Sequence, residues 1–215
     1  MEKKLNANHL KLIAIIAMTA DHIADLFFHT KNLKKYLIRM FSFAIISHFA
    51  YCFAFGINYL PYSTGDIFNQ TSVIWTLAWA LAALWVMNGK HNLKNRQRYV
   101  ILILICLLSF SADWSCIAVM AVIAMYSNRG NLGKQIKAMM VWVFIYAVVS
   151  FLFVNKVYGV ITLFAFLVYF PLKYYNGEKG KLSWMKWLFY IYYPAHLVVI
   201  GILRLLMYGN IPILF

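Results

Sequence analysis

Long apolar runs separated by short polar stretches make up most of this chain. A membrane-spanning helix needs about 20 mostly apolar residues. Six runs approach or exceed that length, at 10–28, 37–58, 72–88, 138–154, 157–172 and 184–208. The pattern predicts an all-α, polytopic integral membrane helical bundle with about 6–8 membrane segments.

A further apolar stretch, 99–127, is interrupted by the polar sequence Ser111-Ala112-Asp113-Trp114-Ser115. Each half has about 14 residues, or about 21 Å of helix, which is shorter than a hydrocarbon core of about 30 Å. We expect two half-helices that form a re-entrant hairpin around Asp113, because irregular backbone is tolerated in a membrane where protein or water surrounds it. One long tilted helix is the alternative.

Composition supports the membrane assignment, because 64% of the residues are hydrophobic and only 12% are charged. The surface of a soluble domain would need far more charge. Without a long polar segment or an internal repeat, residues 1–215 are predicted to form a single membrane domain. The three cysteines lie in apolar runs without metal or redox spacing, so we interpret them as core residues.

The net charge of +14 comes from lysines and arginines in the gaps between apolar runs. This distribution fits membrane topology and anionic lipid headgroups, not nucleic-acid binding. The basic loops 29–39, 89–98, 128–137 and 173–186 should be cytoplasmic.

The N-terminus does not fit this topology. Lys3, Lys4 and Lys11 also favour the cytoplasm, yet only the run 10–28 separates them from the basic loop 29–39. That run is predicted to be an uncleaved first helix, since Asp21 and His22 lie where a signal peptide would have small residues. Either one membrane crossing is missing from the pattern, or the first helix enters with its N-terminus outside or does not cross.

Three ionisable residues, Asp21, His22 and Asp25, occur within five positions of the first apolar run. Such residues are costly in hydrocarbon and usually functional. On a helix, Asp25 is spaced to reach the imidazole of His22, which would raise its basicity as a general base requires. The alternative is a histidine and two carboxylates that solvate a helix end.

The last apolar run contains Tyr193, Pro194 and His196. Pro194 is predicted to free a backbone carbonyl and kink the helix. His196 is then a candidate partner for His22 in a cavity, while a bond from His196 to a neighbouring carbonyl is the structural alternative.

Asp113 is the only acid between Ile101 and Met125, and Trp114 follows it. A cavity role and a plain turn role both fit an aspartate at this position. Asn176 lies in a short basic loop, 174–181, whose amides and lysines could hold the phosphates of a nucleotide-like donor. The alternative is a loop that only connects two helices. His48, in the middle of its span, is interpreted as a satisfied bundle residue, and no metal spacing is present.

Several short motifs, in this order along the chain, resemble those of the TraX family. They are Asp21-His22-Ile23, Phe43-Ala44-Ile45-Ile46-Ser47, Thr76-Leu77, Ala112-Asp113-Trp114, Tyr175-Asn176-Gly177 and Tyr193-Pro194-Ala195-His196. The family pattern has a further apolar span before the His29-Thr30-Lys31-Asn32 region, whereas here Phe28 runs directly into His29. The missing span coincides with the missing crossing.

The resemblance implies a multi-pass acyltransferase of the bacterial cytoplasmic membrane that uses acetyl-CoA and acetylates an amine or hydroxyl. The family's namesake is responsible for N-terminal acetylation of pilin, and glycans or lipids are alternative acceptors. By analogy, His22 would be the base or acyl carrier, and Asp21 or Asp25 would orient it. His196 would line the cavity, and the other candidate cavity residues are Asp113, Trp114, Asn176 and Tyr193.

Two other classes of function remain open from the residues alone. Buried ionisable groups also serve proton-coupled transporters, although the inverted repeats common in such carriers are not apparent here. A non-catalytic membrane assembly protein is the third possibility.

Overall fold

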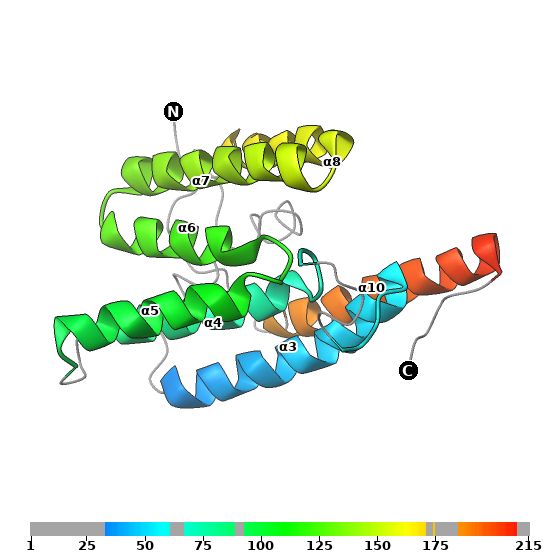
Figure 1. The fold of residues 1–215 in the computed structure, drawn as a ribbon, viewed down its shortest axis with the longest axis horizontal. Helices are drawn as coiled ribbons and strands as arrows, with labels where there is room; N and C mark the ends of the chain where they lie inside the picture. The colour runs from blue at the N-terminus through cyan, green and yellow to red at the C-terminus, as the bar shows by residue number, and fades with distance from the viewer. Residues whose placement is uncertain (1–32, 61–66, 89–92, 171–173, 175–184, 210–215) are drawn as a thin grey trace. The chain divides into compact units, whose positions relative to one another are not determined.

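The computed structural model describes residues 33–60, 67–88, 93–170, 174 and 185–209, without the side chains of Val168 and 185–189. The described residues are helical throughout, apart from the connecting turns. The described helices are α3 (Leu33–Phe55), α4 (Val73–Met87), α5 (Asn95–Ser109), α6 (Ser115–Ser127), α7 (Leu132–Phe153), α8 (Lys156–Thr162), the 3-10 helix η1 (Leu163–Val168) and α10 (Met185–Tyr208). Figure 1 shows these elements. The predicted all-α helical membrane fold is confirmed.

Three stretches are long and apolar enough to cross a membrane, Leu33–Phe55, Leu132–Phe153 and Tyr190–Tyr208. They correspond to the predicted spans 37–58, 138–154 and 184–208. The predicted spans 72–88 and 157–172 form shorter apolar helices. The first predicted span, 10–28, lies outside the described residues, so the missing crossing stays a prediction.

The stretch 99–127 forms two helices, as the interrupted pattern predicts. Helix α5 ends at Ser109 and α6 begins at Ser115, with a turn between them. The alternative of one long tilted helix is therefore wrong, because the polar turn residues bond to another loop instead of continuing the helix. That α5 and α6 form a re-entrant hairpin stays a prediction.

The chain divides into two compact units, one containing 120–185 and the other containing 31–119 and 186–215. In the second unit, α4 is the central helix, with α3 and α5 packed against it. Ile74, Ala78, Leu81 and Ala83 of α4 are fully buried. The edge-on contacts of Phe41 with Trp75 and Trp79 join α3 to α4.

The helices α3 and α5 both run antiparallel to α4. The contacts of α3 run in opposite order along α4, with His48 bonded to Thr71 and Phe41 packed on Trp79. The indole of Trp75, near the start of α4, donates to the carbonyl of Leu108, near the end of α5, at 3.2 Å. The N-terminal ends of α3 and α5 therefore lie at one end of this unit (Figure 1).

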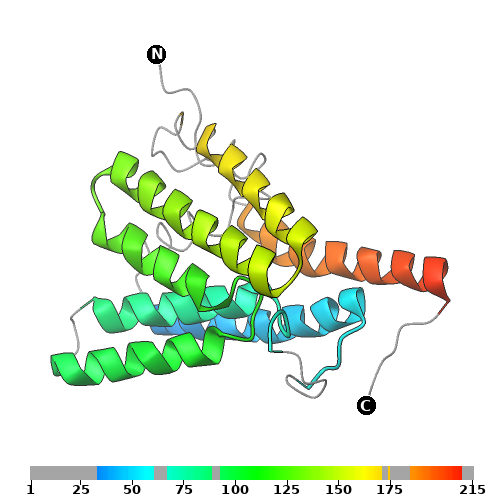
Figure 2. The same ribbon diagram turned by 45° about the horizontal axis from the view of Figure 1, so that its top comes forward.

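In the other unit, α7 packs against α8 and η1 as a helical hairpin (Figure 2). Asn155 caps α8, because its side chain accepts hydrogen bonds from the amides of Val157 and Tyr158. Gly159 allows close approach, since a Cβ there would lie 2.6 Å from the backbone of Phe151. The hairpin therefore depends on a small residue at the contact, as is common between membrane helices.

Candidate functional site

Two loops that are distant in sequence lie side by side and form the candidate site. The amide of Gln70 donates to the carbonyl of Ser111 at 2.7 Å, and the amide of Asp113 donates to the carbonyl of Thr71 at 2.9 Å. Thr71 and Ala112 form a short parallel β-bridge. We call the paired residues 69–72 and 111–115 the loop junction.

Asp113 is held on both sides of its backbone. Its amide bonds to Thr71, and its carbonyl accepts the hydroxyl of Thr76 at 2.9 Å. Thr76 is fully buried on α4, so this hydrogen bond joins the loop junction to the central helix. The position of the only acid in this part of the sequence is therefore fixed by tertiary contacts.

Strained backbone concentrates at the loop junction. Asn69, Trp114 and Ser115 have φ angles of 56°, 67° and 49°, and they are the non-glycine residues with positive φ within the described ranges. Left-handed conformations are costly for side chains other than glycine and persist where surrounding contacts impose them, commonly at functional sites. The strained backbone therefore favours a functional site at the loop junction.

The phenol of Tyr193 comes to the loop junction from α10. It lies within hydrogen-bonding reach of Ser72 and the backbone of Val73, and the Asp113 charge acts on it. Its ring also packs edge-on against Phe43 of α3, with the centroids 6.3 Å apart. The structure therefore places Tyr193 at the same loop junction as Asp113, although these two predicted cavity residues are separated by 80 positions in the sequence. Trp114, a third predicted cavity residue, belongs to the same turn.

His196, one turn beyond Tyr193, makes a local bond. Its Nδ1 lies 3.1 Å from the carbonyl of Tyr192, four residues earlier on α10, and its ring stacks on the ring of Tyr192. This geometry corresponds to the structural alternative given above. The ring of His196 also packs edge-on against Tyr193, with the centroids 5.2 Å apart, and its catalytic role stays a prediction.

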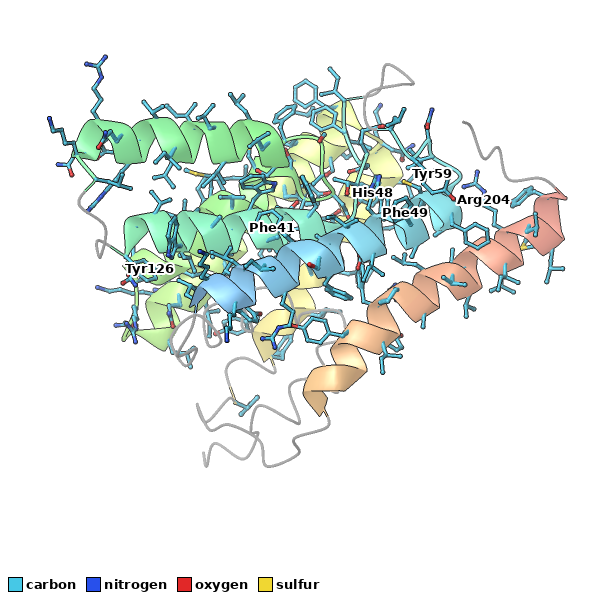
Figure 3. All side chains as sticks on the ribbon, turned by 90° about the horizontal axis from the view of Figure 1, so that it is seen from below. Phe41, His48, Phe49, Tyr59, Tyr126 and Arg204 are labelled. Atoms are coloured by element: carbon cyan, nitrogen blue, oxygen red, sulfur yellow. The ribbon has the colours of Figure 1, made fainter. Side chains whose placement is uncertain are left out.

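His48 lies against the loop junction on its α3 side. Its Nε2 is 2.8 Å from the carbonyl of Tyr59, and its Nδ1 is 3.1 Å from the hydroxyl of Thr71. Figure 3 shows His48 on α3 with Tyr59 nearby. One imidazole thus joins the start and the end of the loop 59–71. Both ring nitrogens of His48 have hydrogen-bond partners, as predicted, but the sequence did not identify Thr71 as one of them.

Three polar side-chain atoms near these residues lack hydrogen-bond partners within the described structure. They are the hydroxyls of Ser47 and Ser72 and the amide oxygen of Gln70, and the three residues are at most 2% exposed. The Ser72 hydroxyl is close to the Tyr193 phenol but does not make a bond of good geometry with it. Buried polar atoms without partners are costly, and in native proteins they often mark a place for water or a ligand.

The other predicted site residues lie outside the described part of the chain. These are the catalytic candidates Asp21, His22 and Asp25 and the loop residue Asn176. Within the ranges that the structure describes, no group of three or more His, Cys, Asp or Glu side chains could hold a metal ion.

Basic residues lie at the end of this unit opposite the loop junction. Lys34, Lys35 and Arg39 are in the first turns of α3, and Lys94, Arg96 and Arg98 are at the start of α5. The 15 residues of α5 separate that end from the loop junction, a length of about 22 Å. The positive-inside rule predicts that the basic end is cytoplasmic, and the loop junction would then lie about that far from it.

Comparisons with known proteins identify one family. The family model described as "TraX protein" matches residues 23–204. The chain is 27% identical to "Probable fimbrial assembly protein FimC, serogroup H1" of Dichelobacter nodosus, over 91% of this chain and 94% of the relative. No solved structure matches the chain.

The alignment with this relative contains positions that this chain lacks. It extends over 238 positions, whereas 91% of 215 residues is about 196 residues, so about 40 positions have no counterpart in this chain. That difference is large enough for a membrane crossing with its loop, since a spanning helix takes about 20 residues.

Proposed function

The chain belongs to the TraX family, and from this premise we propose that it is a multi-pass acyltransferase of the bacterial cytoplasmic membrane. It transfers an acetyl group from cytoplasmic acetyl-CoA to an amine or hydroxyl. The fimbrial assembly relative supports pilin as the acceptor to test first, before glycans or lipids.

The single observation that carries this proposal is the loop junction, where two loops distant in sequence pair and hold the backbone of Asp113, with the Tyr193 phenol near Ser72. A carboxylate from the turn between α5 and α6 and a phenol from α10, beside buried polar atoms without partners, favour a polar ligand site inside an apolar bundle. Strained backbone on both paired loops supports the same interpretation.

In the proposed reaction, His22 accepts the proton of the acceptor amine or hydroxyl as that group attacks the thioester carbonyl. A carbon–nitrogen or carbon–oxygen bond forms, the carbon–sulfur bond breaks, and the thiolate of CoA leaves and takes up a proton. Asp25 or Asp21 orients the imidazole of His22. His196 and Asp113 line the cavity.

The charge distribution suggests how the donor would lie. Coenzyme A carries phosphates at one end and the reacting thioester at the other, and the basic side chains at the starts of α3 and α5 suit the phosphates. The loop 174–181 with Asn176 is a further candidate for phosphate contacts. A thioester that reacts at the loop junction would lie about 20 Å from this basic end, which requires the donor to be extended.

The test compares three purified proteins in detergent, each incubated with labelled acetyl-CoA. Wild type and His29→Ala should release free CoA and transfer label, while His22→Ala should lose transfer by about 10²–10⁴-fold, the usual contribution of a general base. His29→Ala is the matched control. His29 lies in the same region of the sequence as His22, and it has no assigned role. Normal transfer by a folded His22→Ala protein would contradict the role of His22.

The absence of donor turnover by folded wild type would contradict the acyltransferase itself. Proton-driven uptake by liposomes that contain the protein would then establish the carrier alternative.

A further inference from the structure

The contacts of His48 determine where its proton lies. A backbone carbonyl can only accept a hydrogen bond, so in the neutral imidazole the Nε2, 2.8 Å from the Tyr59 carbonyl, carries the hydrogen. The lone pair of Nδ1 then accepts the hydroxyl hydrogen of Thr71 at 3.1 Å. Thr71, His48 and the Tyr59 carbonyl thus form a nucleophile, a base and a group that orients the base, the arrangement that activates hydroxyl nucleophiles.

Cys52, one helical turn from His48, is less suited to be the nucleophile. Its sulfur is 3.7 Å from Nδ1 and 3.6 Å from Nε2, so it is not directed at either nitrogen. Its thiol hydrogen is directed to the carbonyl of Asn58, at 3.6 Å. The Nδ1 lone pair of His48 therefore accepts the hydroxyl hydrogen of Thr71, not the thiol hydrogen of Cys52.

The start of α4 provides a favourable field for chemistry at Thr71. Ser72 is the N-cap residue of α4 and makes no side-chain capping bond, and Thr71 directly precedes it. The amide end of a helix carries partial positive charge, which stabilises negative charge that develops on an attacked carbonyl oxygen.

The residues on each side of Thr71, Gln70 and Ser72, carry two of the buried polar atoms that lack partners. Thr71 itself is only 4% exposed. A polar group of a bound molecule can satisfy such atoms, and a site closed to bulk water protects an ester from hydrolysis.

We propose that Thr71 carries the acyl group during the reaction, with His48 as its base, an inference that rests on the acyltransferase function proposed above. The Thr71 oxygen attacks the carbonyl of an acyl thioester while its proton passes to Nδ1 of His48. A carbon–oxygen bond forms, the carbon–sulfur bond breaks, and the leaving thiolate takes the proton from His48. The acceptor then attacks the Thr71 ester instead of the thioester itself, so the acetyl group is transferred in two steps. His22 takes the proton that the acceptor loses, and that proton returns to the Thr71 oxygen as the ester bond breaks.

The test uses the full chain in detergent, with labelled acetyl-CoA and no acceptor. Wild type should release a burst of about one thiol per protein, as expected when an acyl-enzyme accumulates. Peptide mass spectrometry should find the acetyl group on Thr71. Thr71→Ser should keep both the burst and an adduct at position 71, because it retains a hydroxyl.

Two variants should lose the burst and the adduct while remaining folded by size-exclusion chromatography and thermal unfolding. Thr71→Val removes the nucleophile. His48→Gln keeps an N–H for the Tyr59 carbonyl but has no basic lone pair, so the burst rate should fall by about 10²–10⁴-fold. Thr162→Val, a threonine substitution in the other unit, should behave as wild type.

Three results would overturn the inference. In the first, folded Thr71→Val transfers label at the wild-type rate. His48 would then only hold the ends of the loop 59–71 together, and the acyltransferase function would still stand. In the second, the adduct appears on Cys52 or His22. In the third, wild type does not consume acetyl-CoA, and the proposed function fails together with the inference.

Discussion

Replacing Thr76 by valine tests whether the buried hydroxyl holds the loop junction to the central helix. Thr76 is fully buried, and its hydroxyl donates to the carbonyl of Asp113 at 2.9 Å across 37 positions of sequence. Valine fills nearly the same volume but cannot donate. The substitution therefore removes one long-range hydrogen bond and leaves the Asp113 carbonyl without this donor.

The expected cost follows from the burial of the bond. A buried polar group that loses its partner costs about 1–3 kcal/mol. For chains of 150–250 residues, 1 kcal/mol corresponds to about 2–4 °C in Tm, so Thr76→Val should lower Tm by roughly 2–12 °C. Because the bond also positions Asp113 beside Tyr193, acetyl transfer should fall at temperatures where the variant is still folded.

Thr162→Val is the matched control. The hydroxyl of Thr162 donates at the same distance, 2.9 Å, but to the carbonyl of Tyr158 four residues earlier on the same helix. Such local bonds add little to helix stability, so this variant should stay within about 0.5 kcal/mol of wild type. Thermal unfolding in detergent measures both variants. An equal Tm for Thr76→Val and Thr162→Val would refute the claim that the Thr76 bond holds the loop junction.

Two further substitutions test the packing and the site separately. Gly159→Ala should lower Tm by several degrees, since the new Cβ would lie 2.6 Å from backbone atoms of Phe151 and overpacking costs about 1–3 kcal/mol. An unchanged thermal transition would contradict that close contact. Tyr193→Phe keeps the ring against Phe43 but removes the phenol beside Asp113, so it should slow acetyl transfer at least tenfold with a loss of stability of only about 1 kcal/mol. Transfer at the wild-type rate by this variant would remove Tyr193 from the site.

The helices could be predicted from the sequence because the length and hydrophobicity of a membrane segment are local properties. The spans at 37–58 and 138–154 correspond closely to α3 and α7. The break in 99–127 was also predictable, because five consecutive residues that include Ser111, Asp113 and Ser115 interrupt an otherwise apolar stretch. The geometry of His196 was one of the two expected, since a carbonyl four residues earlier is always within reach on a helix.

The loop junction could not be predicted, because its bonds join residues that local patterns do not relate. His48 and Thr71 are 23 positions apart, and Thr76 and Asp113 are 37 apart. The one available signal was the polar run Asn69-Gln70-Thr71-Ser72 directly before an apolar helix. That run does not indicate which other loop it would pair with.

The most direct test of the central claim is the release of free CoA thiol from acetyl-CoA by purified wild type, measured beside Asp113→Asn. Asparagine keeps the size and the backbone bonds of Asp113 but removes the charge near Tyr193. We expect time-dependent thiol release by wild type and a rate at least tenfold lower for Asp113→Asn, with both proteins folded. Equal rates of thiol release for the two proteins would show that the Asp113 charge has no role in the reaction. Rates no higher than those of empty detergent micelles would contradict the acyltransferase assignment.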